Sequence, residues 1–251
     1  KQEKDVIKQP KRQAISLTGS EKAGASAATA AAGQIKKAVL ELGGSNALIV
    51  LEDANIEKTV KEAVTARFQN TGQSCIAAKR FLVHRRVYDT FLEKFTEAVA
   101  ALKAGDPMDK ETYIGPLARV DLAEEVEKQV NESVALGAKI VLGGKRKDAF
   151  YEPTILTKIT PDMPVFSQEV FGPAVPVVAF NTFEEAVNLS NSTEFGLGVS
   201  IFTEDIEGIK QKISLFDEGA VFINALVKSD PALPFGGVKR SGFGRELAED
   251  G

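Results

Sequence analysis

The sequence predicts an α/β protein with a mostly parallel sheet covered by helices. The first observation is that short apolar runs alternate with longer helical segments, which is typical of parallel strand–helix–strand units. The second is that the later runs, 175–180, 197–202 and 219–223, are apolar almost throughout, as in strands buried on both faces. A chain of 251 residues that is 43% hydrophobic and 26% charged can bury such a core.

The first half of the chain predicts three helices between short strands. The alanine-rich run after residue 20 has high helix propensity. The segment Asp53-Ala54-Asn55 can cap the next helix, in which apolar residues recur every three or four positions. Residues 1–11 are polar and charged, which indicates a frayed helix end or a loop. We expect strands over 13–17, 38–42, 46–51 and 80–84, and helices over 21–34, 56–70 and 87–102.

The second half continues the alternation. A charged helix ends before Gly137, and Pro153 interrupts a short apolar run, so we expect that strand at a sheet edge. Residues 164–173 are expected to be irregular, and 224–234 to form a loop. We expect strands over 138–142, 151–156, 175–180, 197–202 and 219–223, and helices over 119–136, 182–190 and 206–215.

Composition argues against several functional classes. A net charge of −4 provides no basic field for nucleic acid. One cysteine and one histidine favour neither an internal disulfide nor a metal site. No apolar run approaches the roughly 20 residues of a membrane helix. We therefore expect no nucleic-acid partner, no membrane span, no metal ion and a cytoplasmic location.

The single cysteine, Cys75, lies between a polar, glycine-containing turn and a run of small residues. A nucleophilic thiol needs its sulfur at such a turn, near backbone N–H groups that stabilise the thiolate. The alternative is a buried cysteine that only fills space, which is common for this residue type. The flanking residues favour the nucleophile.

Glu41 is the candidate base. It is flanked by leucines and followed by Gly43 and Gly44, and partial desolvation there would raise its pKa toward that of a useful base. The alternative is a solvated glutamate at a strand end. His84 is the only histidine, and a Cys–His pair has to be considered, although its position before Arg85 is typical of a surface residue.

Five blocks of sequence resemble the aldehyde dehydrogenase superfamily, in that family's order. They are Leu-Thr-Gly-Ser (17–20), Leu-Glu-Leu-Gly-Gly (40–44), Asn-Thr-Gly-Gln-Ser-Cys (70–75), Gln-Glu-Val-Phe-Gly-Pro (168–173) and Pro-Phe-Gly-Gly-Val-Lys-Arg-Ser-Gly (234–242). Residues 75–80 and 227–230 make the NAD(P)-dependent succinate-semialdehyde dehydrogenases the most similar branch.

The resemblance implies roles for individual residues. Cys75 would be the nucleophile and Glu41 the general base. The residues expected at the cofactor, NAD or NADP, are Gly19, Ser20, Leu42, Glu169 and Phe171. The residues expected at the substrate are Lys228 and Ser229, as ligands for a carboxylate, and Phe235, beside the thiol. Gly19 and Ser20 also have a simpler explanation, an ordinary helix cap.

The implied reaction is oxidation of an aldehyde, with succinate semialdehyde as the expected substrate, to the carboxylic acid. Cys75 would form a thiohemiacetal, lose hydride to the nicotinamide and become a thioester that water hydrolyses with the help of Glu41. Three alternatives stay open: transfer of the acyl group to coenzyme A, which the presence of Glu41 disfavours; a folded piece with only a structural or interaction role; and a cysteine hydrolase that uses His84.

The resemblance also implies how the chain is divided. Residues 1–43 correspond to a remnant of the NAD(P)-binding domain, and 44–251 to the catalytic domain, whose C-terminal part packs back toward the cofactor domain. We expect the family's N-terminal part and its C-terminal oligomerisation segment to be missing, so that this chain alone is inactive, and the parent protein to be a homodimer or homotetramer. Gln69 stands where some succinate-semialdehyde enzymes have a carboxylate-binding arginine.

Overall fold

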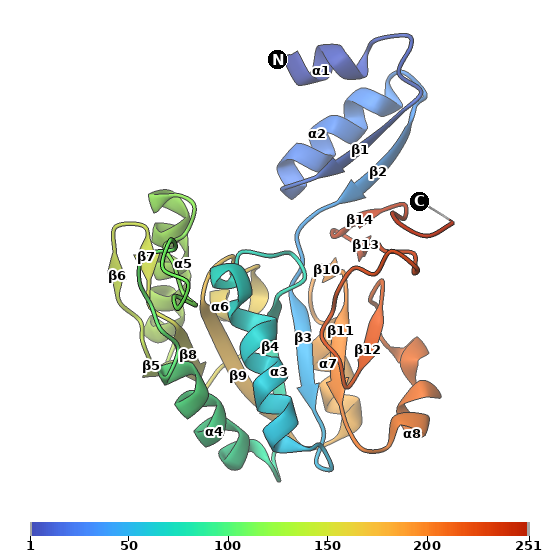
Figure 1. The fold of residues 1–251 in the computed structure, drawn as a ribbon. Coiled ribbons are helices and arrows are strands. Elements are labelled where there is room, and N and C mark those ends of the chain that lie inside the picture. Colours follow the sequence, from blue (N-terminus) through green and yellow to red (C-terminus); the bar gives the residue numbers. More distant parts are fainter. Residues whose placement is uncertain (1, 250–251) are drawn as a thin grey trace.

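The computed structural model describes residues 2–249 and contains a seven-stranded sheet as its main element (Figure 1). The strand order is β12-β11-β3-β4-β9-β8-β5, and every neighbouring pair is parallel except β5 with β8. The strands are β3 (Asn46–Val50), β4 (Ala78–His84), β5 (Lys139–Leu142), β8 (Thr154–Thr157), β9 (Ala174–Phe180), β11 (Val199–Phe202) and β12 (Val221–Ile223).

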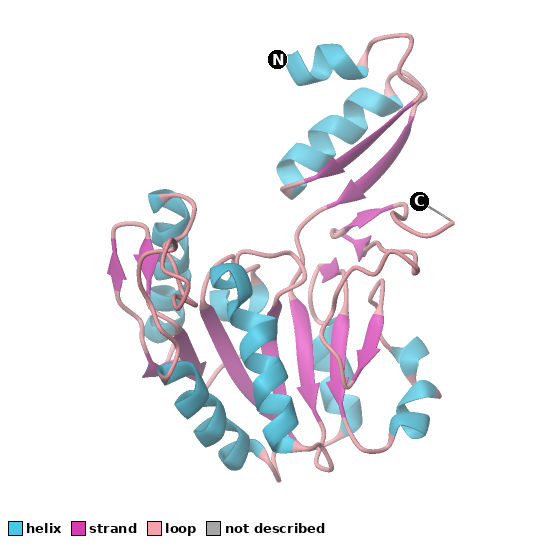
Figure 2. Cartoon of the chain, in the orientation of Figure 1, coloured by secondary structure: helices cyan, strands magenta, loops and turns pink. Residues whose placement is uncertain are grey.

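Helices cover both faces of this sheet, which confirms the predicted fold class (Figure 2). Strand β3, which lies in the interior of the sheet between β11 and β4, is buried along its whole length, and its residues alternate between the two faces. Leu48 and Val50 pack with α3 (Ile56–Phe68) and α4 (Tyr88–Ala100). Ala47 and Ile49 pack on the other side with α7 (Phe183–Asn191) and α8 (Ile206–Lys210).

A third cluster of buried residues lies at the β8 end of the sheet. It packs α5 (Val120–Ala135) and α6 (Pro164–Ser167) against β7 (Phe150–Tyr151) and β8. β7 also pairs with β6 (Arg146–Lys147). The prediction that 164–173 is irregular is therefore wrong at its start, because Pro164 begins a short helix, the position that proline favours.

The prediction of one edge strand over 151–156 is also wrong. Pro153 separates β7 from β8, and β8 lies inside the sheet, between β9 and β5. Because the proline precedes β8, its missing N–H does not interrupt the strand pairing, and the N–H of Thr154 reaches the carbonyl of Pro173.

A smaller sheet forms the N-terminal unit, drawn at the top of Figure 1. It joins β1 (Ala14–Thr18), β2 (Lys37–Glu41) and, from the other end of the chain, β14 (Gly242–Phe243). Two helices belong to this unit, α1 (Gln2–Ile7) and α2 (Glu21–Ala32), while Lys1 lies outside the described residues. Nearby, β10 (Phe195–Gly196) pairs with β13 (Val238–Lys239). The end of β2 is therefore the point where the chain passes from the small sheet to the large one.

The helix expected over 56–70 ends two residues earlier. It passes into a single 3₁₀ turn, η1 (Gln69–Gly72), in which Asn70, Thr71 and Gly72 all have positive φ. Likewise the helix expected over 206–215 divides into α8 and the 3₁₀ turn η2 (Ile213–Leu215). Within residues 2–249, no helix has the length and apolarity to cross a membrane.

Candidate active site

Cys75 lies in the turn between η1 and β4, half-buried and with a free thiol. The turn is fixed by its contact with the segment after α6. A side chain on Gly72 would come within 2.5 Å of the carbonyl oxygen of Gly172, so only glycine allows this approach. From the end of α3, the guanidinium of Arg67 donates to the carbonyls of Val170 and Gly172. The position of the thiol is thus tied to residues about a hundred positions later in the chain.

The electrostatic surroundings of the thiol differ from the expectation. Burial raises the pKa of Cys75 above its ordinary value, and nearby Glu169 raises it further. The Lys79 ammonium and the backbone N–H groups of Cys75 and Ile76 act against that rise in the pKa. The N–H groups of the turn do favour the thiolate, as expected, but desolvation is the larger effect.

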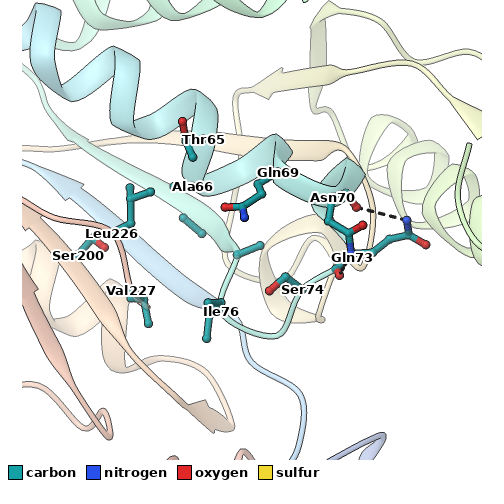
Figure 3. Close-up of a pocket in the computed structure, with 12 residues that line it drawn as sticks. Thr65, Ala66, Gln69, Asn70, Gln73, Ser74, Ile76, Ser200, Leu226 and Val227 are labelled. Carbon is teal, nitrogen blue, oxygen red and sulfur yellow. Dashed lines mark hydrogen bonds between the residues drawn. The ribbon is translucent and has the colours of Figure 1, made fainter. Parts of the chain in front are cut away.

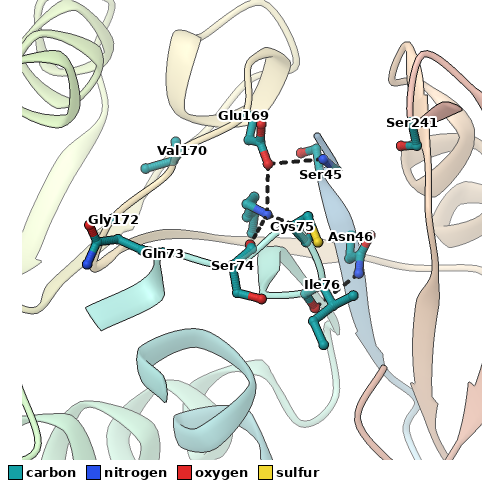
Figure 4. Close-up of polar contacts among 12 residues, drawn as sticks. Ser45, Asn46, Gln73, Ser74, Cys75, Ile76, Glu169, Val170, Gly172 and Ser241 are labelled. Atoms are coloured by element: carbon teal, nitrogen blue, oxygen red, sulfur yellow. Dashed lines mark hydrogen bonds and ion pairs between the residues drawn. The ribbon is translucent and has the colours of Figure 1, made fainter. Parts of the chain in front are cut away.

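Lys79 connects the thiol turn to Glu169. Figure 4 shows Glu169 facing the turn that contains Ser74 and Cys75. The Lys79 side chain is 0% exposed, and its Nζ donates to the carbonyl oxygens of Ser74 at 2.7 Å and Cys75 at 2.9 Å. It also forms an ion pair of 3.1 Å with Glu169 Oε1, which in turn accepts from the N–H of Gly44 at 3.0 Å. Sequence reasoning missed this lysine.

Two glycines allow these groups to meet. A Cβ atom on Gly44 would lie 2.6 Å from the carbonyl oxygen of Cys75, and one on Gly43 would lie 2.5 Å from Glu169 Oε2. The chain that leaves β2 therefore runs directly between the thiol turn and Glu169. Larger residues at these positions would separate them.

Glu41 is the last residue of β2 and lies just before these glycines. It is only 3% exposed, and within the described part of the chain neither carboxylate oxygen has a hydrogen-bond partner. Burial raises its pKa from 4.5 to about 7; the charge of Glu246 adds to the rise and Arg245 opposes it. The N–H of Gly19 binds the backbone carbonyl of Glu41. This is the desolvated carboxyl group that its leucine flanks indicate, and Glu246 is a neighbour that the sequence analysis missed.

The carboxylate of Glu41 and the thiol have different immediate neighbours. Oε1 of Glu41 lies near Gly236, within 3.0 Å of the position a Cβ atom would take there. The charged groups that shift the pKa of Cys75 are instead Lys79 and Glu169. Gly43 and Gly44 connect the two environments along the chain. The backbone from Glu41 to Gly44 is three residues long and spans at most about 10 Å.

The residues predicted at the cofactor fall into two groups. Glu169, whose side chain is 21% exposed, and Phe171, which is 36% exposed as a residue, lie beside Lys79 and close to the thiol. Gly19 and Ser20 lie at the start of α2, where the Ser20 hydroxyl accepts from Ala23 N and caps the helix. Leu42 is buried, with its side chain against Gly24 of α2. A partly exposed carboxylate and an aromatic ring beside a glycine segment fit a ribose and its attached ring.

A cavity of about 260 Å³ opens beside the thiol turn (Figure 3). Gln69 from η1 lies on one side of it, and Leu226 and Val227 lie on the other. The other lining residues are Thr65, Ala66, Asn70, Gln73, Ser74, Ile76, Ala77, Ala78 and Ser200.

The predicted substrate residues are not in this lining. Lys228 and Ser229 are exposed, although they directly follow Val227 in the chain. Phe235 is half-buried and pairs through its backbone with Glu246. The loop thus contributes apolar side chains to the cavity.

His84 lies far from the thiol. It ends β4, whereas Cys75 precedes that strand, and the seven residues of β4 span roughly 20 Å. Its Nε2 is 3.1 Å from the carbonyl oxygen of Asn181, and its Nδ1 accepts from the N–H of Arg86. A Cys–His pair is therefore excluded. In residues 2–249 no three acidic, histidine or cysteine side chains form a metal-binding group.

Three features are typical of enzymes that react through a cysteine nucleophile: a free thiol at a constrained turn, a buried cation beside it and a buried carboxyl group nearby. The family model for the aldehyde dehydrogenase family matches residues 2–251, and the chain belongs to this family. The resemblance found in the sequence is confirmed.

Comparison with curated proteins and solved structures shows which members of the family this chain is similar to. The chain is 50% identical over 246 residues to succinate-semialdehyde dehydrogenase [NADP(+)] of Mycobacterium avium, covering 97% of this chain and 52% of that protein. It is 52% identical over 242 residues to a probable enzyme of the same name from Synechocystis, covering 95% of this chain and 53% of that protein. The chain thus spans about half the length of the curated relatives it matches.

Among solved structures, the succinic semialdehyde dehydrogenase of Streptococcus pyogenes in complex with NADP+ is 40% identical, with a TM-score of 0.96. The match covers 100% of this chain and 56% of that one. Betaine aldehyde dehydrogenase of Staphylococcus aureus with NAD+ is 32% identical, with a TM-score of 0.93, and the match covers 99% of this chain and 50% of that one.

Proposed function

We propose that the protein containing this chain oxidises an aldehyde, succinate semialdehyde, to the carboxylic acid through a covalent thioester on Cys75. The observation that carries the proposal is the buried Glu41 carboxyl group, which has no hydrogen-bond partner within residues 2–249 and which Gly43 and Gly44 connect to the thiol turn. A carboxyl group with a pKa of about 7 is half ionised near neutral pH, as a general base requires.

The chain's own groups perform the covalent steps. The Cys75 thiolate attacks the aldehyde carbon, and the backbone N–H of Cys75 donates to the oxyanion that forms. Once the thioester exists, Glu41 takes a proton from a water molecule, and the water oxygen displaces the sulfur. For this step the Glu41 side chain has to turn from Gly236 toward Gly44, or act through one intervening water.

A nicotinamide nucleotide, when bound, accepts the hydride that leaves the substrate carbon. We assign its ribose to the carboxylate of Glu169 and its nicotinamide end to the ring of Phe171. Gly19 and Ser20 would lie toward the phosphates, at the N-terminus of α2. Leu42 would support this region by packing against α2. The names of the relatives favour NADP+ over NAD+.

The substrate cavity would be the one lined by Gln69 and Val227. Its polar amide groups can bind the distal carboxylate of succinate semialdehyde, and Lys228 and Ser229 would contribute at its outer end if their loop closes. Phe235 would pack beside the aldehyde. In this proposal residues 1–43 serve the nucleotide and 44–251 hold the thiol, in a cytoplasmic homodimer or homotetramer.

The test compares succinate semialdehyde with butanal, a neutral aldehyde of the same chain length, using NADP+ and then NAD+. We expect the highest kcat/KM with succinate semialdehyde and NADP+, succinate as the product, and no turnover after Cys75→Ser. Equal rates with both aldehydes would contradict the substrate assignment. Formation of an acyl-CoA in the presence of coenzyme A would favour acyl transfer over hydrolysis.

A further inference from the structure

The proposed reaction uses Cys75, Glu41 and Glu169 but gives no role to Lys79. This lysine lies between Cys75 and Glu169. A fully buried ammonium is costly unless all its donors are used. Lys79 has three donors and three acceptors in reach, the carbonyls of Ser74 and Cys75 and the carboxylate of Glu169. Every one of these acceptors belongs to the thiol turn or to the expected ribose contact.

We propose that Lys79 is a positioning residue, which holds the Cys75 turn and the Glu169 carboxylate in one charge network and favours the thiolate of Cys75. The proposal rests on the proposed function, because it concerns the reactivity of the same thiol. Its geometric basis is that Lys79 holds the backbone of the nucleophile itself, through the Cys75 carbonyl, and the side chain of Glu169 at the same time.

The two ends of this ion pair act on the sulfur in opposite directions. Lys79 lowers the pKa of Cys75, and Glu169 raises it. Burial lowers the pKa of Lys79 itself, Glu169 raises it, and the positive charge of Arg67 in α3 lowers it further. Loss of the lysine charge therefore removes support for the thiolate, while burial and Glu169 continue to oppose it.

A purely structural role for Lys79 is the competing explanation, and the next residue offers a matched control. Arg80 is also in β4 and 0% exposed, and its guanidinium donates to the carbonyls of Ser45, Leu189 and Ser190. The charged groups that shift the pKa of Cys75 most are Lys79 and Glu169, and none of the three carbonyls that accept from Arg80 belongs to the thiol turn. Replacing either cation costs stability, but only Lys79 should change the thiol.

The experiment measures the rate at which iodoacetamide alkylates Cys75 between pH 6 and 10, followed by intact mass. Cys75 is the only cysteine in these 251 residues, and peptide mapping of the alkylated protein assigns the signal to it. We expect Lys79→Met to move the midpoint of the rate profile upward by about one pH unit, a roughly tenfold lower rate at pH 7.5. Lys79→Arg should return most of the shift, and Arg80→Met should leave the midpoint in place.

Glu169→Gln keeps the experiment decisive if Lys79→Met does not fold. It is nearly isosteric and partly exposed, and removing its charge should lower the midpoint and raise the alkylation rate several-fold. An unchanged profile in Lys79→Met, or an unchanged or higher midpoint in Glu169→Gln, would overturn the proposal. The assay contains no aldehyde and no nucleotide, so its failure is separate from a failure of the proposed oxidation, which Cys75→Ser tests.

Discussion

Replacing Glu41 with glutamine should stabilise the protein at neutral and alkaline pH. In the folded chain the carboxyl group is 3% exposed, without a hydrogen-bond partner among the described residues, and has a pKa of about 7 instead of 4.5. Above pH 4.5 the unfolded chain therefore releases this proton more easily than the folded one. Stability from this group is complete below pH 4.5 and is lost as the pH rises to about 7.

The size of the effect follows from the two pKa values. The gap between 4.5 and about 7 corresponds to about 3 kcal/mol of lost stability once both states are ionised, with a slope of roughly 1.4 kcal/mol per pH unit between them. Glutamine has a similar shape and no charge to lose. Glu41→Gln should therefore match the wild type near pH 4.5 and exceed it by up to about 3 kcal/mol at pH 8.

Urea unfolding at intervals from pH 4.5 to 8.5 measures this difference. Subtracting the two curves cancels the titration of groups distant from Glu41. Glu184→Gln, at an exposed glutamate of α7, provides the control and should give a flat difference. A flat difference for Glu41→Gln as well would refute the argument that this carboxyl group is held desolvated for use as a base.

Two further predictions concern the thiol turn and the cavity. Gly44→Ala places a Cβ atom 2.6 Å from the carbonyl oxygen of Cys75 and should slow acylation of the thiol roughly 100-fold, measured by stopped flow. Gly33→Ala is the control, because the nearest atom to its Cβ would be 3.6 Å away, and it should leave the acylation rate unchanged. A comparable rate in both variants would contradict the close approach. Gln69→Arg introduces a cation into the cavity lining and should lower the KM for succinate semialdehyde about tenfold, while the KM for butanal stays the same. An equal change in KM for both aldehydes would exclude carboxylate binding in this cavity.

The parts of the fold that were predictable are those with a strong local pattern. β3 agrees with the expected strand to within one residue, because residues buried on both faces form a continuous apolar run. The run 151–156 misled because Pro153 breaks it into two strands, and a proline next to a strand does not reveal which neighbours that strand has. The end of α3 depended on backbone angles at Asn70 and Thr71 that no simple pattern predicts.

The site shows the same division. Cys75 and Glu41 were noticeable because of their immediate neighbours, glycine turns and leucines, and the burial of Glu41 agrees with that signal. Lys79 was missed because its main partner, Glu169, is distant in sequence and only the fold brings them together. A lysine within a run of small and apolar residues before a buried strand was a usable signal. The sequence does not show which side chains of the loop at Lys228 face the cavity, because tertiary packing decides that Val227 lines it and Lys228 is exposed.

The central claim is that Cys75 forms the acyl intermediate and Glu41 promotes its hydrolysis. The most direct measurement acylates the protein with p-nitrophenyl acetate, which needs no nucleotide, and follows the mass of the acetyl-enzyme with time. The account predicts one acetyl group, on Cys75, which turns over in the wild type with a rate that rises through about pH 7 and accumulates in Glu41→Gln. Equal loss of the acetyl group in the wild type and in Glu41→Gln would contradict it.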